Sequence, residues 1–81
     1  MNPERRNAHR RRTLKEGRVI FDGSATDCVI RDLSNGGARL RFSSAFEAPS
    51  ALELLIVNPG IRIRASAAWQ RGNDVGVSFT R

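Results

Sequence analysis

With 81 residues, 40% of them hydrophobic and 27% charged, the chain has the length and composition of one small globular domain. The single cysteine excludes an internal disulfide, and the single histidine leaves no cluster able to hold a metal. The formal net charge of +6 favours an anionic partner: nucleic acid, a membrane surface or a phosphorylated small molecule. Because the sequence has neither a long apolar stretch nor an N-terminal signal peptide, we expect a cytoplasmic protein without membrane insertion.

The positive charge is concentrated at the N-terminus. Residues 1–18 carry two acidic side chains and seven basic ones, a local charge of +5, the basic ones being Arg5, Arg6, Arg10, Arg11, Arg12, Lys15 and Arg18. We expect residues 1–17 to form a flexible basic arm and residues 18–81 to form the folded domain. Such a run of like charge is often a solvated tail that binds polyanions without specificity. The more specific alternative is a binding site for one particular anion.

From Arg18 onward, short extended segments alternate with turn residues, a rhythm typical of an all-β fold. Apolar residues at 38, 40 and 42 alternate with two arginines, as a strand with one buried face requires. The same alternation places Trp69 on one face with Ile61 and Ile63, so packing in the core or at the end of the barrel is favoured over ligand contact for this ring. The expected strands are Arg18–Phe21, Thr26–Leu33, Ala38–Phe42, Leu52–Val57, Ile61–Gln70 and Val75–Phe79.

Six short strands in so small a chain predict a six-stranded antiparallel β-barrel. A flat sheet would leave its apolar face in water, whereas closure buries that face and removes the exposed edges. The best helical window, residues 45–55, is interrupted by Pro49. The sequence ends at Arg81, so we expect no substantial C-terminal helix and a minimal, single-domain protein. Cys28 is expected to be a small buried residue of the barrel.

Two short motifs lie on either side of the first expected hairpin. Arg6–Arg10 reads R-x-x-x-R, and twenty-two residues after Arg10 the second strand ends in Asp32–Gly37, a D-x-S-x-x-G. Each motif is weak alone, because R-x-x-x-R arises easily in arginine-rich sequence and D-x-S-x-x-G is also common in ordinary turns after a strand. In this order, and in an all-β chain, the two together are much more specific.

On these motifs the sequence resembles the PilZ family, bacterial domains that bind the second messenger cyclic di-GMP on the outside of a six-stranded β-barrel. The resemblance extends from Glu4 to Phe79 and includes the final segment AAWQRGNDVGVSF. The ligand-binding residues that it implies are Arg6, Arg10, Asp32, Ser34 and Gly37. Secondary candidates are Arg5, Arg11, Gly36 and Trp69. The basic run after Arg10 leaves open whether Arg11 or Arg12 takes its place.

These residue types suit the chemistry of that ligand. Guanine O6 and N7 are paired acceptors for an arginine fork, and a second arginine can pair with phosphate or stack on a purine. Asp32 can accept from guanine N1–H and N2–H2, which would select guanine over adenine. Ser34 can donate to phosphate or hold the turn, and Gly36–Gly37 permits positive φ and close backbone approach to the ligand. The plain alternative for Asp32 and Ser34 is an ordinary turn.

We therefore expect a cyclic di-GMP sensor in bacterial second-messenger signalling, with no catalytic or metal residues and no cofactor. Binding would order the arm over the barrel and present a new surface to a downstream effector protein. The main rival is a basic nucleic-acid-binding β-barrel. Such a barrel would need exposed aromatic rings, whereas the alternation along the strands places most aromatic residues of this chain on the core face. A third hypothesis is an adaptor that keeps the barrel and binds only protein.

Overall fold

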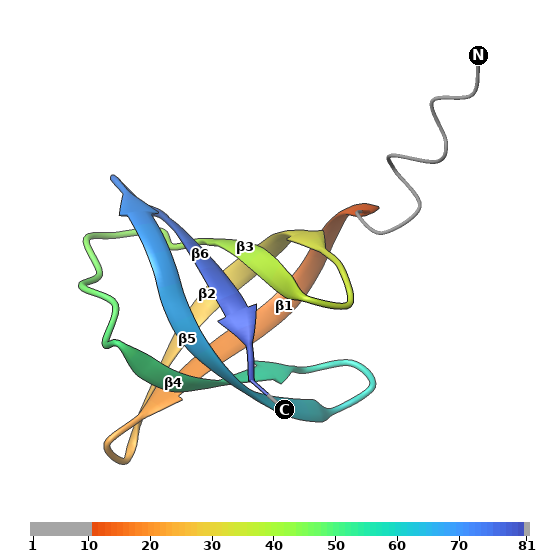
Figure 1. The fold of residues 1–81 in the computed structure, drawn as a ribbon, viewed down its shortest axis with the longest axis horizontal. Helices are drawn as coiled ribbons and strands as arrows, with labels where there is room; N and C mark the ends of the chain where they lie inside the picture. Colours follow the sequence, from red (N-terminus) through yellow and green to blue (C-terminus); the bar gives the residue numbers. More distant parts are fainter. Residues whose placement is uncertain (1–10, 81) are drawn as a thin grey trace.

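The computed structural model describes the backbone of residues 11–80 and the side chains of residues 14–80. Six antiparallel strands form a closed barrel in the order β1-β2-β3-β6-β5-β4 (Figure 1). Their bounds are β1 (Arg11–Phe21), β2 (Ser24–Leu33), β3 (Gly37–Arg41), β4 (Ala51–Ile56), β5 (Ile61–Arg71) and β6 (Asp74–Phe79). No helix occurs within residues 11–80. The predicted all-β, six-stranded antiparallel barrel is confirmed.

The first strand is longer than its sequence predicts. β1 begins at Arg11 instead of Arg18 and pairs with β2 from Arg11 to Phe21. The expected boundary between residues 17 and 18 therefore falls inside a strand. Leu14, Lys15 and Glu16 are all exposed, so no alternation of buried and exposed residues marks this half of the strand. Its extended conformation comes from backbone pairing with β2, which is a tertiary effect.

Two tight turns set the register of the hairpins. Asp22 and Gly23 both have positive φ, 55° and 81°, and connect the paired residues Phe21 and Ser24. This is the pattern of a two-residue type I′ turn, for which Asp-Gly is a favoured sequence. At the other hairpin, Gly72 has a φ of 60° between β5 and β6. Both turns match the right-handed twist that a closed barrel needs.

The core lies inside the barrel and comes from inward-facing residues of all six strands and of the loop after β3. Its buried members are Val19, Cys28, Ile30, Leu40, Phe42, Leu52, Leu54, Ile56, Ala65, Val75 and Val77. The predicted alternation in β3 and the predicted burial of Cys28 are confirmed. Burial raises the pKa of the Cys28 thiol to about 12, with a smaller contribution from the negative charge of Asp27.

The long loop between β3 and β4 is held against the barrel by β5. The rings of Phe42 and Phe46 stack with their centroids 4.1 Å apart. The Gln70 side chain accepts a hydrogen bond of 3.1 Å from the Ala48 amide and donates one to the Phe46 carbonyl. These contacts pack Phe46 and Ala48 against the core.

Candidate ligand-binding site

Three β-bulges interrupt the register of the barrel, each inserting one extra residue into a strand. They lie between Arg12 and Lys15 on β1, between Ile30 and Asp32 on β2, and between Ala67 and Trp69 on β5. Cross-strand pairing links the bulges into one level of the barrel, because Asp32 is in register with both Arg12 and Arg39. An extra residue reverses the face on which the following side chain lies, so a bulge breaks the simple alternation.

The bulge on β2 turns Asp32 to the outside of the barrel. Asp32 has the same parity as the buried Ile30, yet it pairs with Arg39, whose neighbour Leu40 points into the core. Asp32 Oδ2 lies 2.8 Å from Arg39 Nε, and the two side chains are 10% and 32% exposed. Arg39 Nε is buried and its N–H is not directed at an acceptor, so the contact is an ion pair without a linear hydrogen bond.

The bulge on β5 does the same to Trp69, and the prediction that this ring packs in the core is wrong. Trp69 is 46% exposed and pairs with Gly76 of β6. A Cβ atom on Gly76 would collide with Nε1 of the indole, so the ring lies directly over the backbone of this glycine. Only glycine at position 76 allows the aromatic side chain to lie across β6 in this way.

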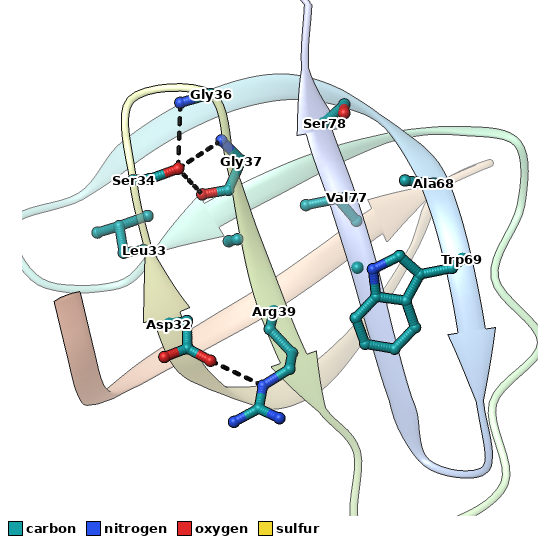
Figure 2. Close-up of a pocket in the computed structure, with 12 residues that line it drawn as sticks. Asp32, Leu33, Ser34, Gly36, Gly37, Arg39, Ala68, Trp69, Val77 and Ser78 are labelled. Atoms are coloured by element: carbon teal, nitrogen blue, oxygen red, sulfur yellow. Dashed lines mark hydrogen bonds and ion pairs between the residues drawn. The ribbon is translucent and has the colours of Figure 1, made fainter. Parts of the chain in front are cut away.

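Asp32, Arg39, Gly76 and Trp69 therefore form a continuous row across four neighbouring strands. Each is the direct cross-strand partner of the next, from β2 through β3 and β6 to β5. Figure 2 shows the Arg39 guanidinium between the Asp32 carboxylate and the Trp69 ring. The backbone of Arg12 in β1 extends the row at its Asp32 end.

This row and the β2–β3 turn line a pocket of about 210 Å³ on the outer wall of the barrel (Figure 2). The turn contributes Leu33, Ser34, Gly36 and Gly37 to the lining, and β6 contributes Val77 and Ser78. Pockets that enclose a whole small molecule usually measure roughly 300–1,000 Å³. The pocket therefore suits one part of a larger ligand, such as a single nucleobase.

The Ser34 side chain holds the β2–β3 turn together. Its hydroxyl accepts hydrogen bonds of 3.2 Å from the amides of Gly36 and Gly37 and donates one of 3.3 Å to the Gly37 carbonyl. The Ser34 amide also donates to the Gly37 carbonyl, at 2.9 Å. Of the two roles considered for this hydroxyl, the structure therefore shows the one that stabilises the turn.

The positive φ expected for the glycine pair of this turn is not observed. Neither Gly36 nor Gly37 has positive φ. A Cβ atom on Gly37 would instead collide with the carbonyl oxygen of Val77, whereas a Cβ on Gly36 would meet no atom within 4 Å. Position 37 thus requires glycine because β3 approaches the β6 backbone closely there. The wall of the pocket depends on this close approach.

Further arginines make the wall beside the pocket electropositive. Arg41 forms a bidentate pair with Asp74, with Nε–Oδ1 and Nη2–Oδ2 distances of 2.7 and 3.0 Å. The hydrogen bonds from Arg41 are the largest influence on Asp74 and lower its pKa, burial opposes them as the second influence, and the positive charges of Arg41, Arg39 and Arg31 lower the pKa further. Three arginines on this wall thus face two carboxylates, Asp32 and Asp74, and the excess of positive charge favours an anion there.

The structure brings the barrel half of the predicted site together. Asp32, Ser34, Gly36, Gly37 and Trp69 all line the same pocket. The predicted arm residues Arg5, Arg6 and Arg10 lie outside the described residues, and of Arg11 only the backbone is described, paired with Leu33.

Sequence reasoning missed the central place of two residues in this pocket. Arg39 and Gly76 both line it, in register with each other on β3 and β6. The sequence shows Arg39 as an outward member of an alternating strand, for which a solvated face is favoured over contact with phosphate, and no local signal indicates that it faces Asp32. The side chains of residues 14–80 include no group suited to a metal, and the backbone of residues 11–80 includes no helix long and apolar enough to cross a membrane.

Comparisons with known proteins agree with this geometry. An uncharacterized protein of Legionella, Lpg0364, has a similar crystal structure, with a TM-score of 0.61 and 20% sequence identity over 89% of this chain and 76% of the other. A search among curated proteins found no significant match. The family model of the PilZ domain matches residues 4–81, almost the entire sequence. The chain therefore belongs to the PilZ domain family, whose members are receptor domains for cyclic di-GMP.

Proposed function

We propose that this domain is a cyclic di-GMP sensor that holds one guanine of the ligand in the pocket between Asp32 and Trp69. The observation that carries the proposal is the position of Asp32. A bulge turns this motif carboxylate out of the core and into the wall of a base-sized pocket, beside the turn that Ser34 closes. A structural aspartate that only ended a strand would not require this bulge.

Asp32 has the chemistry to select guanine. Its carboxylate accepts hydrogen bonds and guanine offers two adjacent donors, N1–H and N2–H2, whereas adenine has an acceptor at N1. The exposed face of Trp69 at the other end of the row can stack on a purine, an interaction that contributes about 1–3 kcal/mol per base. The electropositive wall around Arg41 and Asp74 favours the phosphates.

The arm would complete the site from the other side. Arg11 and Arg12 are in register with Leu33 and Asp32, so β1 starts beside the pocket, and Arg10 directly precedes this strand in the sequence. Arg6 and Arg10 would pair with the phosphates or with guanine O6 and N7. Ordering of the arm over the pocket would create the surface that a downstream effector protein recognises in the cytoplasm. Signalling of this kind needs neither catalysis nor a cofactor.

Calorimetric titration of the whole chain tests the proposal. Cyclic di-GMP should bind, GTP and a random oligonucleotide should bind far more weakly, and Arg10→Ala and Asp32→Ala should each abolish measurable binding. Asp27→Ala is the matched control, since Asp27 also pairs with an arginine, Arg18, but lies on the exposed surface away from the pocket. It should bind like the wild type.

The nucleic-acid rival predicts a different result. Oligonucleotide binding would then weaken steeply with salt, because each phosphate contact releases counterions, and it would not depend on the Asp32 carboxylate. Tight oligonucleotide binding that Asp32→Ala leaves unchanged, together with absence of cyclic di-GMP binding, would overturn the proposal.

A further inference from the structure

The Asp32–Arg39 pair occupies the middle of the candidate site. The two side chains sit at the centre of the row, with Asp32 Oδ2 and Arg39 Nε 2.8 Å apart, and both line the pocket. Within residues 14–80, this carboxylate is the only one that lines the pocket, and Arg39 is the only arginine that does so. They therefore place a set of acceptors and a set of donors side by side.

We infer that Arg39 is a specificity-determining residue that reads guanine O6 while Asp32 reads N1–H and N2–H2 of the same base. This inference rests on the proposed function. The edge of guanine that carries N1 presents one acceptor, O6, followed by two donors. A guanidinium next to a carboxylate presents the complementary order of one donor group followed by two acceptor oxygens.

The geometry leaves both partners able to bind a base. The ion pair uses Arg39 Nε and one carboxylate oxygen, and it lacks the geometry of a linear hydrogen bond. An ionised carboxylate has about four lone-pair positions, so Asp32 retains acceptor capacity. Figure 2 shows the two terminal nitrogens of Arg39 beyond the Nε atom that faces the Asp32 carboxylate. A base bound by Asp32 would therefore meet these nitrogens at its neighbouring position.

The same pair rejects adenine at two positions. Adenine carries an amino donor in place of O6, which would face the guanidinium donors. It also carries an acceptor at N1, which would face the carboxylate. Each mismatch leaves a polar group of the pocket without a partner, and sites built on such hydrogen bonds discriminate strongly. Arg39 thus adds a second test of base identity to the one that Asp32 supplies.

The experiment measures affinities of three cyclic dinucleotides for wild type and Arg39→Met. The ligands are cyclic di-GMP, its 6-thioguanine analogue, in which sulfur, a weak acceptor, replaces O6, and its hypoxanthine analogue, which lacks the N2 amino group. Wild type should bind the sulfur analogue about 10–100-fold more weakly than cyclic di-GMP, as expected for loss of a hydrogen bond to a charged donor. In Arg39→Met this difference should disappear, while the hypoxanthine penalty, which depends on Asp32, should persist.

Arg41→Met is the matched control. Arg41 lies two residues further along β3, also points outward and also pairs with an aspartate, Asp74, but it does not line the pocket. Its loss removes the same charge from the same strand and from the wall that favours the phosphates, so Arg41→Met should weaken all three ligands alike and keep the full sulfur penalty. Arg39→Lys covers the case in which the methionine variant unfolds. The lysine ammonium can still pair with Asp32, but it lacks the two terminal nitrogens of the guanidinium. Arg39→Lys should therefore also lose most of the sulfur penalty.

A sulfur penalty of equal size in wild type and in both Arg39 variants would overturn the inference. So would a uniform weakening of all three ligands, because that is the effect of a residue that only supports the fold or the general charge. Both results leave cyclic di-GMP binding by wild type intact, so they refute the role of Arg39 alone. Failure of wild type to bind cyclic di-GMP would refute the proposed function, and the role of Arg39 with it.

Discussion

The barrel has a regular wall and a bulged wall, and only the bulged wall carries the candidate site. In the regular wall, formed by the β1–β4 and β4–β5 pairs, the register runs without interruption. In the bulged wall, formed by β2, β3, β6 and the end of β5, extra residues turn Asp32 and Trp69 outward. Alternation of side chains is sufficient to build a core, but a binding surface needed local breaks in it.

The ion pairs of the barrel differ in the same way. Arg18 and Asp27 lie 3.1 Å apart across β1 and β2 with side chains 45% and 79% exposed, so water screens their attraction. Exposed pairs of this kind contribute about 0–1 kcal/mol. The Asp32–Arg39 pair is far less exposed, and its polar atoms face a pocket. Loss of the Arg18–Asp27 pair should therefore leave binding intact, whereas loss of the Asp32–Arg39 pair should not.

The largest expected effect lies in the core behind the regular wall. Leu54 of β4 is completely buried, so Leu54→Ala should lower the free energy of unfolding by about 2–5 kcal/mol through lost burial and a cavity. Thermal denaturation measures this loss. Leu55→Ala, on the opposite face of the same strand and only partly buried, is the control and should cost much less. Both variants should bind cyclic di-GMP normally while folded, and lost binding would show that the regular wall takes part in the site.

The next effect separates the two glycines of the β2–β3 turn. Gly37→Ala should destabilise the domain by about 1–3 kcal/mol, because the new Cβ meets the Val77 carbonyl and two backbones must move apart. In a domain of this size that lowers the melting temperature by roughly 4–8 °C per kcal/mol. Gly36→Ala should change stability by no more than about 0.5 kcal/mol, since its Cβ enters open space. Equal melting temperatures for both variants would contradict the close β3–β6 approach.

An effect of similar size, on binding instead of stability, should distinguish two exposed aromatic rings. Trp69→Ala should weaken cyclic di-GMP binding by about 1–3 kcal/mol if the indole stacks on a guanine. Phe21→Ala, at the β1–β2 hairpin and similarly exposed, should leave the affinity unchanged. Since Trp69 is the only tryptophan, its fluorescence should also change on titration of the wild type. Unchanged fluorescence and affinity would remove Trp69 from the site.

The smallest effect concerns the pair next to the pocket. Arg41 holds the pKa of Asp74 below its ordinary value of 3.8, so the pair stabilises the fold above that value and loses this contribution as pH falls through the lower folded-state pKa. Arg41→Met should therefore melt slightly below wild type at pH 7, and the difference should shrink at low pH, below the folded-state pKa of Asp74. A difference that is the same at both pH values would show that Arg41 acts through packing instead of charge.

Much of the fold was predictable because the core follows a simple period. Leu40, Val75 and Val77 are buried where alternation placed them, and Asp22-Gly23 forms the tight turn that its composition favours. The first half of β1 was not predictable, since its exposed side chains give no signal and pairing with β2 alone makes it extended. For Trp69 the error came from carrying an unbroken period across a bulge.

The sequence by itself determined the class of fold, the family and the identity of the motif residues on the barrel. Those properties depend on local patterns: alternating apolar residues, turn residues, and the D-x-S-x-x-G that begins at Asp32. Only the tertiary structure decided that Asp32, Arg39 and Trp69 share one outer row. The reason is physical, because the face on which a side chain lies after a bulge depends on hydrogen bonding to the neighbouring strand, and no residue of the bulge alone specifies that register.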